Sequence, residues 1–268
     1  MPDLYAQITT LDPSVLDILI KASETRAVDP RQRAIRQTFL SWIDLPDRAR
    51  LLEVGCGSGA ICRELAGLPK VREVVGLDPS GYILAKGREL AAGFTNLAFR
   101  EGDARALPFA ADEFDLVVFH TCLCHVPGPE KALTEACRVL RPGGTLLVYD
   151  GDYATTTVAL GDHDPLAACT DCAMSNLVHD RWLVRRLPQL TRAAGFLVER
   201  FDSHGFVQTG EAEYMAGLVS RGADLLVAAG RIDRHLADGL KREAQRRVEG
   251  GAFFGFIAFA SLIARKPA

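Results

Sequence analysis

The sequence predicts an α/β fold in which a mostly parallel sheet is covered by helices on both faces. Five short apolar runs between residues 51 and 149 alternate with helical stretches, which is typical of parallel strands joined by helices. Of the 268 residues, 48% are hydrophobic and 24% are charged, so the chain has enough apolar side chain to form a core. Its length favours one large domain with additions.

Composition also narrows the range of partners. Lys and Arg number 31 against 34 Asp and Glu, and this balance disfavours a nucleic-acid partner, which requires a basic face. No basic and apolar leader is visible, and the most apolar run, 252–264, is shorter than the roughly 20 residues of a membrane helix. Seven scattered cysteines fit a reducing compartment. We expect a cytoplasmic protein without stable membrane insertion. Its oligomeric state is left open, with a homodimer as one alternative.

The first 150 residues divide into two helices and the alternating core. Apolar residues at helical spacing predict helices over 12–26 and 30–42, and a proline begins each of them. Strands are expected at 51–54, 73–77, 97–100, 114–119 and 145–149. Helices are expected between most of them, at 60–68, 82–92 and 129–140.

The regular alternation ends after residue 150. Residues 151–178 lack a clear period and are interpreted as a loop or lid, followed by a helix over 180–194 that ends at Gly195. A strand at 196–201, mostly helix over 211–249 and a last strand at 252–265 complete the chain. We therefore expect a single domain over 1–268. Its expected parts are an N-terminal helical cap (1–47), a cofactor-binding core (48–150), a lid and helix (151–195), and C-terminal strands (196–268) with a helical insertion (207–250).

The most informative segment is the glycine-rich loop in residues 51–60, LLEVGCGSGA. A strand ends in Gly55, Gly57 and Gly59, and a helix follows. Glycines let the backbone turn tightly and let a ligand approach closely. The loop alone is ambiguous, because Gly55, Gly57 and Ala60 also satisfy the dinucleotide-binding pattern G-x-G-x-x-G/A.

Three acidic residues at strand ends favour one type of ligand. Glu53 lies two residues before the first glycine, where its carboxylate can face an ammonium group. Asp78 ends the next strand, where an acid binds the hydroxyls of a ribose. Asp103 follows the third strand and can accept a hydrogen bond from an exocyclic amine. For Asp78 and Asp103, the alternative of a helix cap stays open.

Five ordered motifs resemble the class I S-adenosylmethionine-dependent methyltransferases. They are EVGCGSG at 53–59, GLDPS at 76–80, EGDA at 101–104, FDLVVFH at 114–120 and RVLRPGGTLL at 138–147. The segment HVPGPEKAL at 125–133 is most similar to the ubiquinone/menaquinone-biosynthesis type and its small-molecule relatives. The resemblance implies a Rossmann-like sheet of seven strands with the last strand antiparallel.

The resemblance also implies a role for each site residue, with S-adenosyl-L-methionine as the cofactor. Glu53 and the glycines would hold the methionine end, and Asp78 the ribose. The adenine would be bound by Asp103 and the backbone of Ala104. The remaining expected neighbours of the cofactor are Pro79 and Ile83, which would wall the adenosine, and His120, which would lie near the acceptor.

His125 is the leading candidate for a general base. It follows the fourth strand at the carboxyl edge of the sheet, and a neutral imidazole accepts a proton near neutral pH. A purely structural role in the loop before residue 129 stays open, and Asp150, Asp152 and Tyr153 are rival candidates. Cys169 and Cys172 form a single C-x-x-C pair, which is too little for a metal site, and we expect no metal.

These observations predict methyl transfer to the oxygen or carbon of a small, largely apolar molecule of the quinone, polyketide or other secondary-metabolite type. The alternatives are a nicotinamide-dependent oxidoreductase and a protein that binds the cofactor without transferring its methyl group. The cap and lid are expected to cover the cofactor and form the acceptor pocket. Tyr5 and Arg36 are candidates to reach inward, although for Arg36 an exposed position on the helix is the main expectation.

Overall fold

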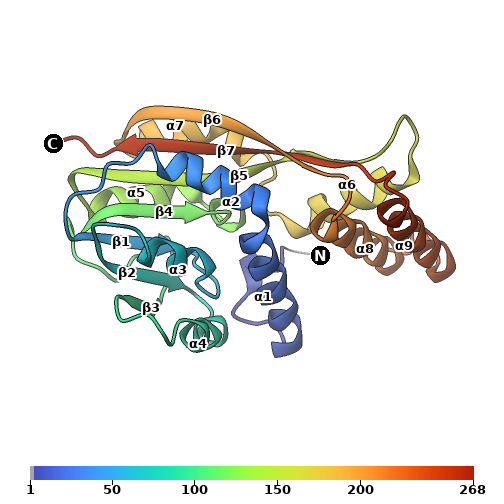
Figure 1. Ribbon diagram of the computed structural model, residues 1–268, viewed down its shortest axis with the longest axis horizontal. Coiled ribbons are helices and arrows are strands. Elements are labelled where there is room, and N and C mark those ends of the chain that lie inside the picture. Colours follow the sequence, from blue (N-terminus) through green and yellow to red (C-terminus); the bar gives the residue numbers. More distant parts are fainter. Residues whose placement is uncertain (1–2) are drawn as a thin grey trace.

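A seven-stranded sheet forms the centre of the molecule (Figure 1). The computed structural model describes residues 3–268, so the first two residues of the expected N-terminal cap lie outside it. The strand order is β3-β2-β1-β4-β5-β7-β6, and β7 runs antiparallel to both of its neighbours while the remaining pairs are parallel. This arrangement confirms the expected α/β sheet with an antiparallel last strand.

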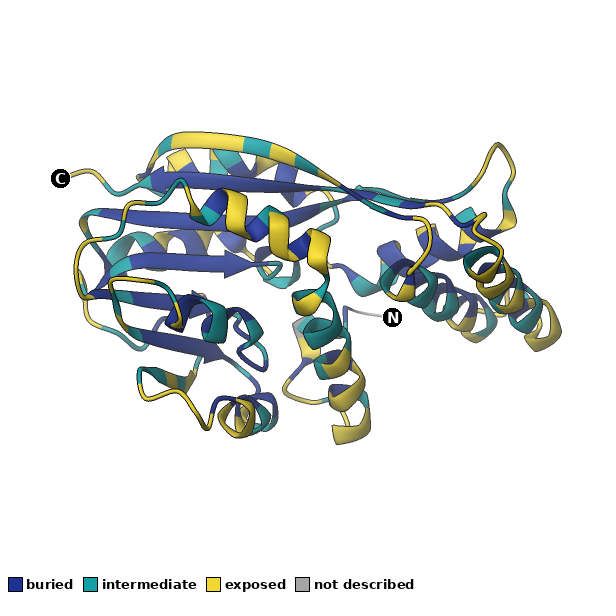
Figure 2. Ribbon diagram, in the orientation of Figure 1, coloured by how far each residue is buried: buried dark blue, intermediate teal, exposed yellow. Residues whose placement is uncertain are grey.

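The central strands are buried on both faces, as expected for a sheet covered by helices (Figure 2). The parallel part contains β1 (Ala49–Val54), β2 (Val71–Asp78), β3 (Leu97–Glu101) and β4 (Phe114–His120). The remaining strands are β5 (Leu140–Val158), β6 (Leu197–Gln208) and β7 (Gly255–Arg265).

Helices cover both faces of the sheet, with α2 and α3 in front and α5 and α7 behind in the view of Figure 1. Those that precede or join the parallel strands are α1 (Pro13–Val28), α2 (Pro30–Leu40), α3 (Ala60–Ala66), α4 (Gly81–Leu90) and α5 (Pro129–Val139). Two short 3₁₀-helices are η1 (Tyr5–Gln7) and η2 (Leu123–His125). The later helices are α6 (Pro165–Leu177), α7 (Leu183–Ala193), α8 (Glu213–Ala228) and α9 (Arg234–Glu249).

The interpretation of residues 151–178 as a loop is wrong. β5 continues to Val158, because the start of β7 pairs with its far end. The carboxylate of Asp150 does not break the strand, since it accepts from the backbone N–H groups of Cys124 (3.1 Å) and Gly151 (2.9 Å). α6 then begins at an Asp-Pro pair, with Asp164 accepting from the N–H of Leu166 at 3.0 Å.

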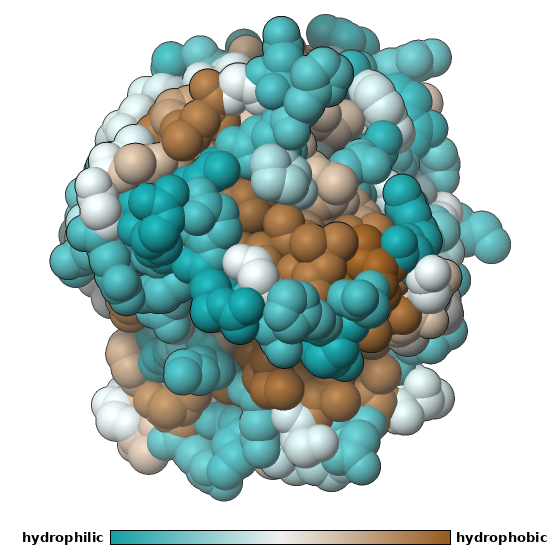
Figure 3. All heavy atoms as spheres, turned by 90° about the vertical axis from the view of Figure 1, so that its right-hand side faces the viewer, coloured by the Kyte–Doolittle hydropathy of each residue, from teal (hydrophilic) through white to brown (hydrophobic). Residues whose placement is uncertain are grey.

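The C-terminal insertion, α8 and α9, packs beside α6 at the end of the long strands, away from the parallel part of the sheet (Figure 1). The face of the molecule on that side carries hydrophobic residues surrounded by hydrophilic ones (Figure 3). Within residues 3–268, no helix has both the length and the hydropathy needed to cross a lipid bilayer.

Candidate active site

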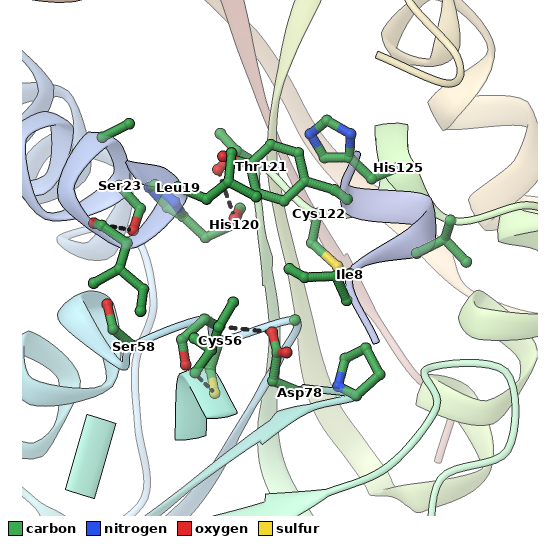
Figure 4. Close-up of a pocket in the computed structure, with 18 of the residues that line it drawn as sticks. Ile8, Leu19, Ser23, Cys56, Ser58, Asp78, His120, Thr121, Cys122 and His125 are labelled. Atoms are coloured by element: carbon green, nitrogen blue, oxygen red, sulfur yellow. Dashed lines mark hydrogen bonds between the residues drawn. The ribbon is translucent and has the colours of Figure 1, made fainter. Parts of the chain in front are cut away.

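A cavity of about 340 Å³ opens at the carboxyl ends of β1, β2 and β4. The glycine loop and the start of α4 form one end, and η1, α1, α6 and α8 close over the other. Figure 4 shows Cys56 and Asp78 at the glycine-loop end, with His125 on the far side of Thr121 and Cys122. The sheet and the added helices therefore enclose one shared space, at the edge where open α/β sheets bind ligands.

The glycines of the loop have different structural roles. Gly55, Gly57 and Gly59 all have positive φ, between 54° and 76°. Gly55 and Gly57 line the cavity, whereas Gly59 lies outside the lining and faces Phe99. A Cβ on Gly59 would lie 2.4 Å from the Phe99 ring, and one on Gly55 would lie 2.1 Å from Cys122 Sγ.

Asp78 ties the glycine loop to the end of β2. Its side chain is buried, and its carboxylate accepts from the backbone N–H groups of Gly57 and Ser80, each at 2.9 Å. Burial raises the pKa of Asp78 to about 6, although both hydrogen bonds oppose that shift. Pro79 and Ile83 line the cavity directly beyond it, as expected for the adenosine side.

Glu53 is a buried carboxyl group on the floor of the same end. The Cys62 thiol donates to Glu53 Oε2 at 2.8 Å. Burial raises the pKa of Glu53 to about 8, so the group holds a proton at neutral pH. A buried carboxyl without a cationic partner is suited to a ligand that supplies one.

Asp103 and Ala104 both line the cavity, but they differ in exposure. Ala104 is buried, but Asp103 is nearly half exposed and pairs with Arg105 at 2.6 Å. The Arg105 guanidinium is the main reason why the pKa of Asp103 lies below its usual value. Binding an adenine amine would therefore require Asp103 to exchange or share this partner.

His120 lies at the end of β4 and lines the middle of the cavity. Its ring packs against Tyr149 with a centroid separation of 4.9 Å, and its buried Nε2 has no hydrogen-bond partner within residues 3–268. Burial lowers the pKa of His120 well below its usual value, and the nearby Arg26 adds to that effect. The imidazole is therefore neutral, with a nitrogen available for a ligand.

His125 is held by a residue from the N-terminus. Its Nδ1 lies 2.7 Å from Asp3 Oδ2, and its ring packs on Tyr5 with a centroid separation of 4.4 Å. Because Asp3 Oδ2 also accepts from the backbone N–H of His179 (2.8 Å), the carboxylate is an acceptor and Nδ1 must carry the proton. Nε2 is then the basic nitrogen of His125, on a residue that lines the cavity.

The other residues singled out in the sequence differ in whether they line the cavity. Tyr153 lines the cavity, whereas Asp150 and Asp152 lie outside its lining. Tyr5 reaches inward as expected, but Arg36 is fully buried and ion-paired with Glu64 at 2.8 Å, so its expected exposure is wrong. In the described part of the chain, no three His, Cys, Asp or Glu side chains are grouped for a metal ion.

The sequence did not identify the residues that line the far end of the cavity. Two cations line it, Arg26 from α1 and Arg221 from α8, together with Tyr214. Apolar side chains complete this end: Leu19, Met174, Leu177, Val178 and Leu218. No local pattern marks them, because they come from helices that are far apart in the sequence.

Comparison with known proteins agrees with this architecture. Residues 52–148 match the family model described as a methyltransferase domain. The 2-phytyl-1,4-naphtoquinone methyltransferase of Thermosynechococcus vestitus is 32% identical over 123 residues, covering 46% of this chain and 55% of that protein. The ubiquinone/menaquinone biosynthesis C-methyltransferase UbiE of Roseobacter denitrificans is 35% identical over 121 residues, covering 44% of this chain and 48% of that protein.

The part of the chain that is similar to known proteins is therefore a methyltransferase domain over residues 52–148. Its matched segment contains Glu53, Asp78, Asp103 and His120. The first relatives in the comparison align with 62%, 41% and 46% of this chain, and the chain spans about half of their length. The added helices that close the cavity lie outside the matched segment.

Solved structures share the fold over more of the chain. The [4+2]-cyclase SpnF superposes with a TM-score of 0.61 at 23% identity, covering 100% of this chain and 98% of that chain. The phosphoethanolamine N-methyltransferase 2 of Haemonchus contortus, solved with S-adenosylhomocysteine, has a TM-score of 0.56 at 16% identity and covers 93% of this chain and 57% of that chain. At these identities the likeness concerns the fold alone.

Proposed function

We propose that the protein transfers a methyl group from S-adenosyl-L-methionine to an oxygen or carbon of a small, largely apolar molecule. The proposal includes a cytoplasmic location, in keeping with free cysteines throughout the described chain. It also assigns cofactor binding to residues 48–150 and acceptor binding to the added helices. The named quinone methyltransferases among the relatives support an acceptor of that general class.

The charges around the glycine loop favour this cofactor over a dinucleotide. The N-terminus of α3, where a pyrophosphate would bind, has Glu24 beside it: Ser58 Oγ donates to Glu24 Oε1 at 2.5 Å. Glu53 lies buried below the same loop. Glu53 can lose its proton beside the ammonium group of a methionine moiety, whereas a pyrophosphate would meet only carboxyl groups here, one of them protonated and the other paired with Arg63. This charge placement carries the proposal.

The other residues at this end fit the rest of the cofactor. Asp78 has lone pairs left for two hydroxyls after accepting two backbone N–H groups. Pro79 and Ile83 offer apolar walls for adenosine, and Gly57 has no atom within 4 Å of the place where a Cβ would stand. When bound, the cofactor supplies an electrophilic methyl group on its sulfonium.

The chain's own residues would position the acceptor and manage its proton. His125 Nε2 is the base of the proposal, with Asp3 as a positioning residue that keeps the proton on Nδ1. Apolar side chains from α1, α6 and α8 would exclude water from the acceptor. Alignment of acceptor and methyl group in such an enclosed space accounts for much of the rate enhancement in methyl transfer.

Calorimetry with S-adenosylhomocysteine and with NAD tests the cofactor assignment. We expect the thioether to bind and NAD to give no heat, and Asp78→Ala to weaken the thioether by about tenfold or more because two hydroxyl contacts are lost. Glu89→Gln, at an exposed position on α4, serves as the control and should bind as the parent does. Binding of NAD alone would support the oxidoreductase alternative instead.

Transfer itself requires a separate measurement, because a protein named as a cyclase shares the whole fold. Methyl-labelled cofactor should yield labelled product with reduced quinones or phenols, and His125→Ala should reduce turnover while leaving thioether affinity unchanged. Tight thioether binding without labelled product from any acceptor would favour a cofactor-bound protein with a different activity.

A further inference from the structure

The two ends of the cavity are lined by different charged groups. The carboxyl groups that line it, Glu53, Asp78 and Asp103, all belong to the glycine-loop end, where Arg105 pairs with Asp103. The charged side chains that line the other end within residues 3–268 are Arg26 and Arg221. Both come from helices outside the methyltransferase match, so this charge belongs to the part of the chain that encloses the acceptor.

Neither arginine has a carboxylate partner in the described chain. Arg26 Nη2 donates to Thr121 Oγ1 at 2.6 Å, and Arg221 Nε donates to the carbonyl of Gly217, on its own helix, at 3.3 Å. Both side chains are partly buried. A guanidinium has five N–H donors, so each keeps several donors for a ligand.

Other partly or fully buried arginines of this chain are paired with carboxylates. Arg36 pairs with Glu64, Arg63 with Glu24 and Arg247 with Asp164. These pairs are the usual arrangement, because an unpaired cation is costly to remove from water. Arg26 and Arg221 lack such a carboxylate partner, and both line the cavity where a ligand would lie.

The backbone next to Arg26 supports a positioning role for this contact. Thr121 is a β-branched residue with φ of 50°, which L residues with branched side chains rarely adopt. Its hydroxyl accepts from Arg26 and donates to the carbonyl of His120 at 2.8 Å. Such strained conformations persist where the surrounding structure holds them, and they are concentrated at functional sites.

We propose that the acceptor is an anion, a carboxylate on an apolar body, and that Arg26 and Arg221 bind its carboxylate. This inference rests on the proposed methyl transfer, whose sulfonium cofactor would add another positive charge to the same enclosed space. An anionic acceptor neutralises that charge, whereas a cationic amine would increase it. The apolar side chains from α1, α6 and α8 then contact the body of the acceptor.

The test uses the full chain saturated with S-adenosylhomocysteine and titrated with matched acids and amides. Benzoate, 2-naphthoate and dodecanoate are each compared with the corresponding neutral amide. We expect at least one acid to bind about tenfold more tightly than its amide, because charge-assisted bidentate contacts require the carboxylate. Arg26→Gln and Arg221→Gln should each remove most of that preference while leaving amide affinity unchanged, and Arg26→Lys should restore part of it.

Arg33→Gln is the matched control, since Arg33 is exposed on α2, outside the cavity lining, and should change nothing. If no acid is preferred over its amide, the inference is wrong. The inference is also wrong if Arg26→Gln weakens the binding of S-adenosylhomocysteine while both glutamine variants leave acid binding unchanged. Arg26 would then bind the carboxylate of the cofactor and not that of the acceptor. Failure of the parent protein to bind S-adenosylhomocysteine would instead overturn the proposed function.

Discussion

The glycine-loop end of the cavity is acidic and comes from one stretch of chain, whereas the opposite end is basic and comes from several separate segments. Glu53 and Asp78 lie at the ends of β1 and β2, and Asp103 follows β3. Arg26, His125 and Arg221 belong to α1, η2 and α8. The two ends also differ in the sequence separation of their contacts: Asp78 accepts from residues 2 and 21 positions away, whereas Asp3 contacts His125 and His179, 122 and 176 positions away.

This difference indicates that the ends should respond differently to mutation. A loop held by backbone hydrogen bonds and packed glycines is part of the sheet, so damage there should reduce stability. A chamber closed by a few long-range side-chain contacts should open locally while the sheet stays folded.

The largest expected effect separates two glycines of the same loop. Alanine at either position should lower the free energy of unfolding by about 1–2 kcal/mol, because an L residue is strained in the left-handed conformation. At Gly59 the new methyl group also meets the Phe99 ring, which adds about 1–3 kcal/mol of overpacking. We therefore expect urea denaturation to show a clearly larger loss for Gly59→Ala than for Gly57→Ala.

Cofactor affinity should show the reverse order. Gly57 lines the cavity and Gly59 does not, so Gly57→Ala should weaken S-adenosylhomocysteine while folded Gly59→Ala binds it normally. Equal losses of stability in the two variants would contradict the view that Gly59 is a packing residue of the fold.

The sequence predicted the glycine-loop end well because its information is local. Carboxyl ends of parallel strands meet at one edge of a sheet, so residues 53, 78 and 103 could be placed together from the order of strands alone. The far end depends on contacts such as Arg26 with Thr121, 95 residues apart, and His125 with Asp3, 122 residues apart. No spacing within either segment predicts these pairs.

One error had an available signal. α6 begins at Asp164-Pro165, the same capped start that identifies α1 at Asp12-Pro13. The preceding Asp150-Gly151-Asp152 reads as a turn, since nothing local indicates that the Asp150 carboxylate is satisfied by the N–H of Cys124 inside the fold. Composition cannot reveal that an acidic side chain will be buried and hydrogen-bonded inside the fold.

A change at the basic end should have a smaller and more local effect. Asp3→Ala removes three acceptor contacts, to the N–H of Tyr5, the N–H of His179 and the ring of His125. We expect a loss of about 1–3 kcal/mol. Hydrogen exchange should become faster around residues 3–10 and 178–180, while the protection of β1 and β4 and the thioether affinity stay unchanged.

Asp44→Ala is the control for this variant, because Asp44 is exposed and its ion pair with Lys70 lies outside the cavity. Faster exchange in β1 or β4 of Asp3→Ala, to the same extent as around residue 3, would show that the two ends unfold together. The contrast between a rigid loop and a locally opening chamber would then be wrong.

The smallest expected effect is a proton released at the acidic end. Burial raises the pKa of Glu53 to about 8, so in the free protein the carboxyl group is mostly protonated at about pH 7. An ammonium group bound beside it favours the carboxylate and lowers that pKa, so binding must release part of a proton. Affinity for S-adenosylhomocysteine should therefore rise between about pH 6 and pH 8.

Stability of the free protein should follow the opposite trend. The folded state keeps the Glu53 proton up to about pH 8, whereas the unfolded chain loses it near its usual pKa of about 4.5, so stability contributed by this group falls as pH rises through that window. Glu53→Gln should remove both the proton release, measured by calorimetry in buffers of different ionisation enthalpy, and this slope. The guanidinium groups of the basic end stay charged throughout this range. If Glu53→Gln released as much proton as the parent, the proton released on binding would come from another group. The buried carboxyl group of Glu53 would then not be the site that binds the ammonium group.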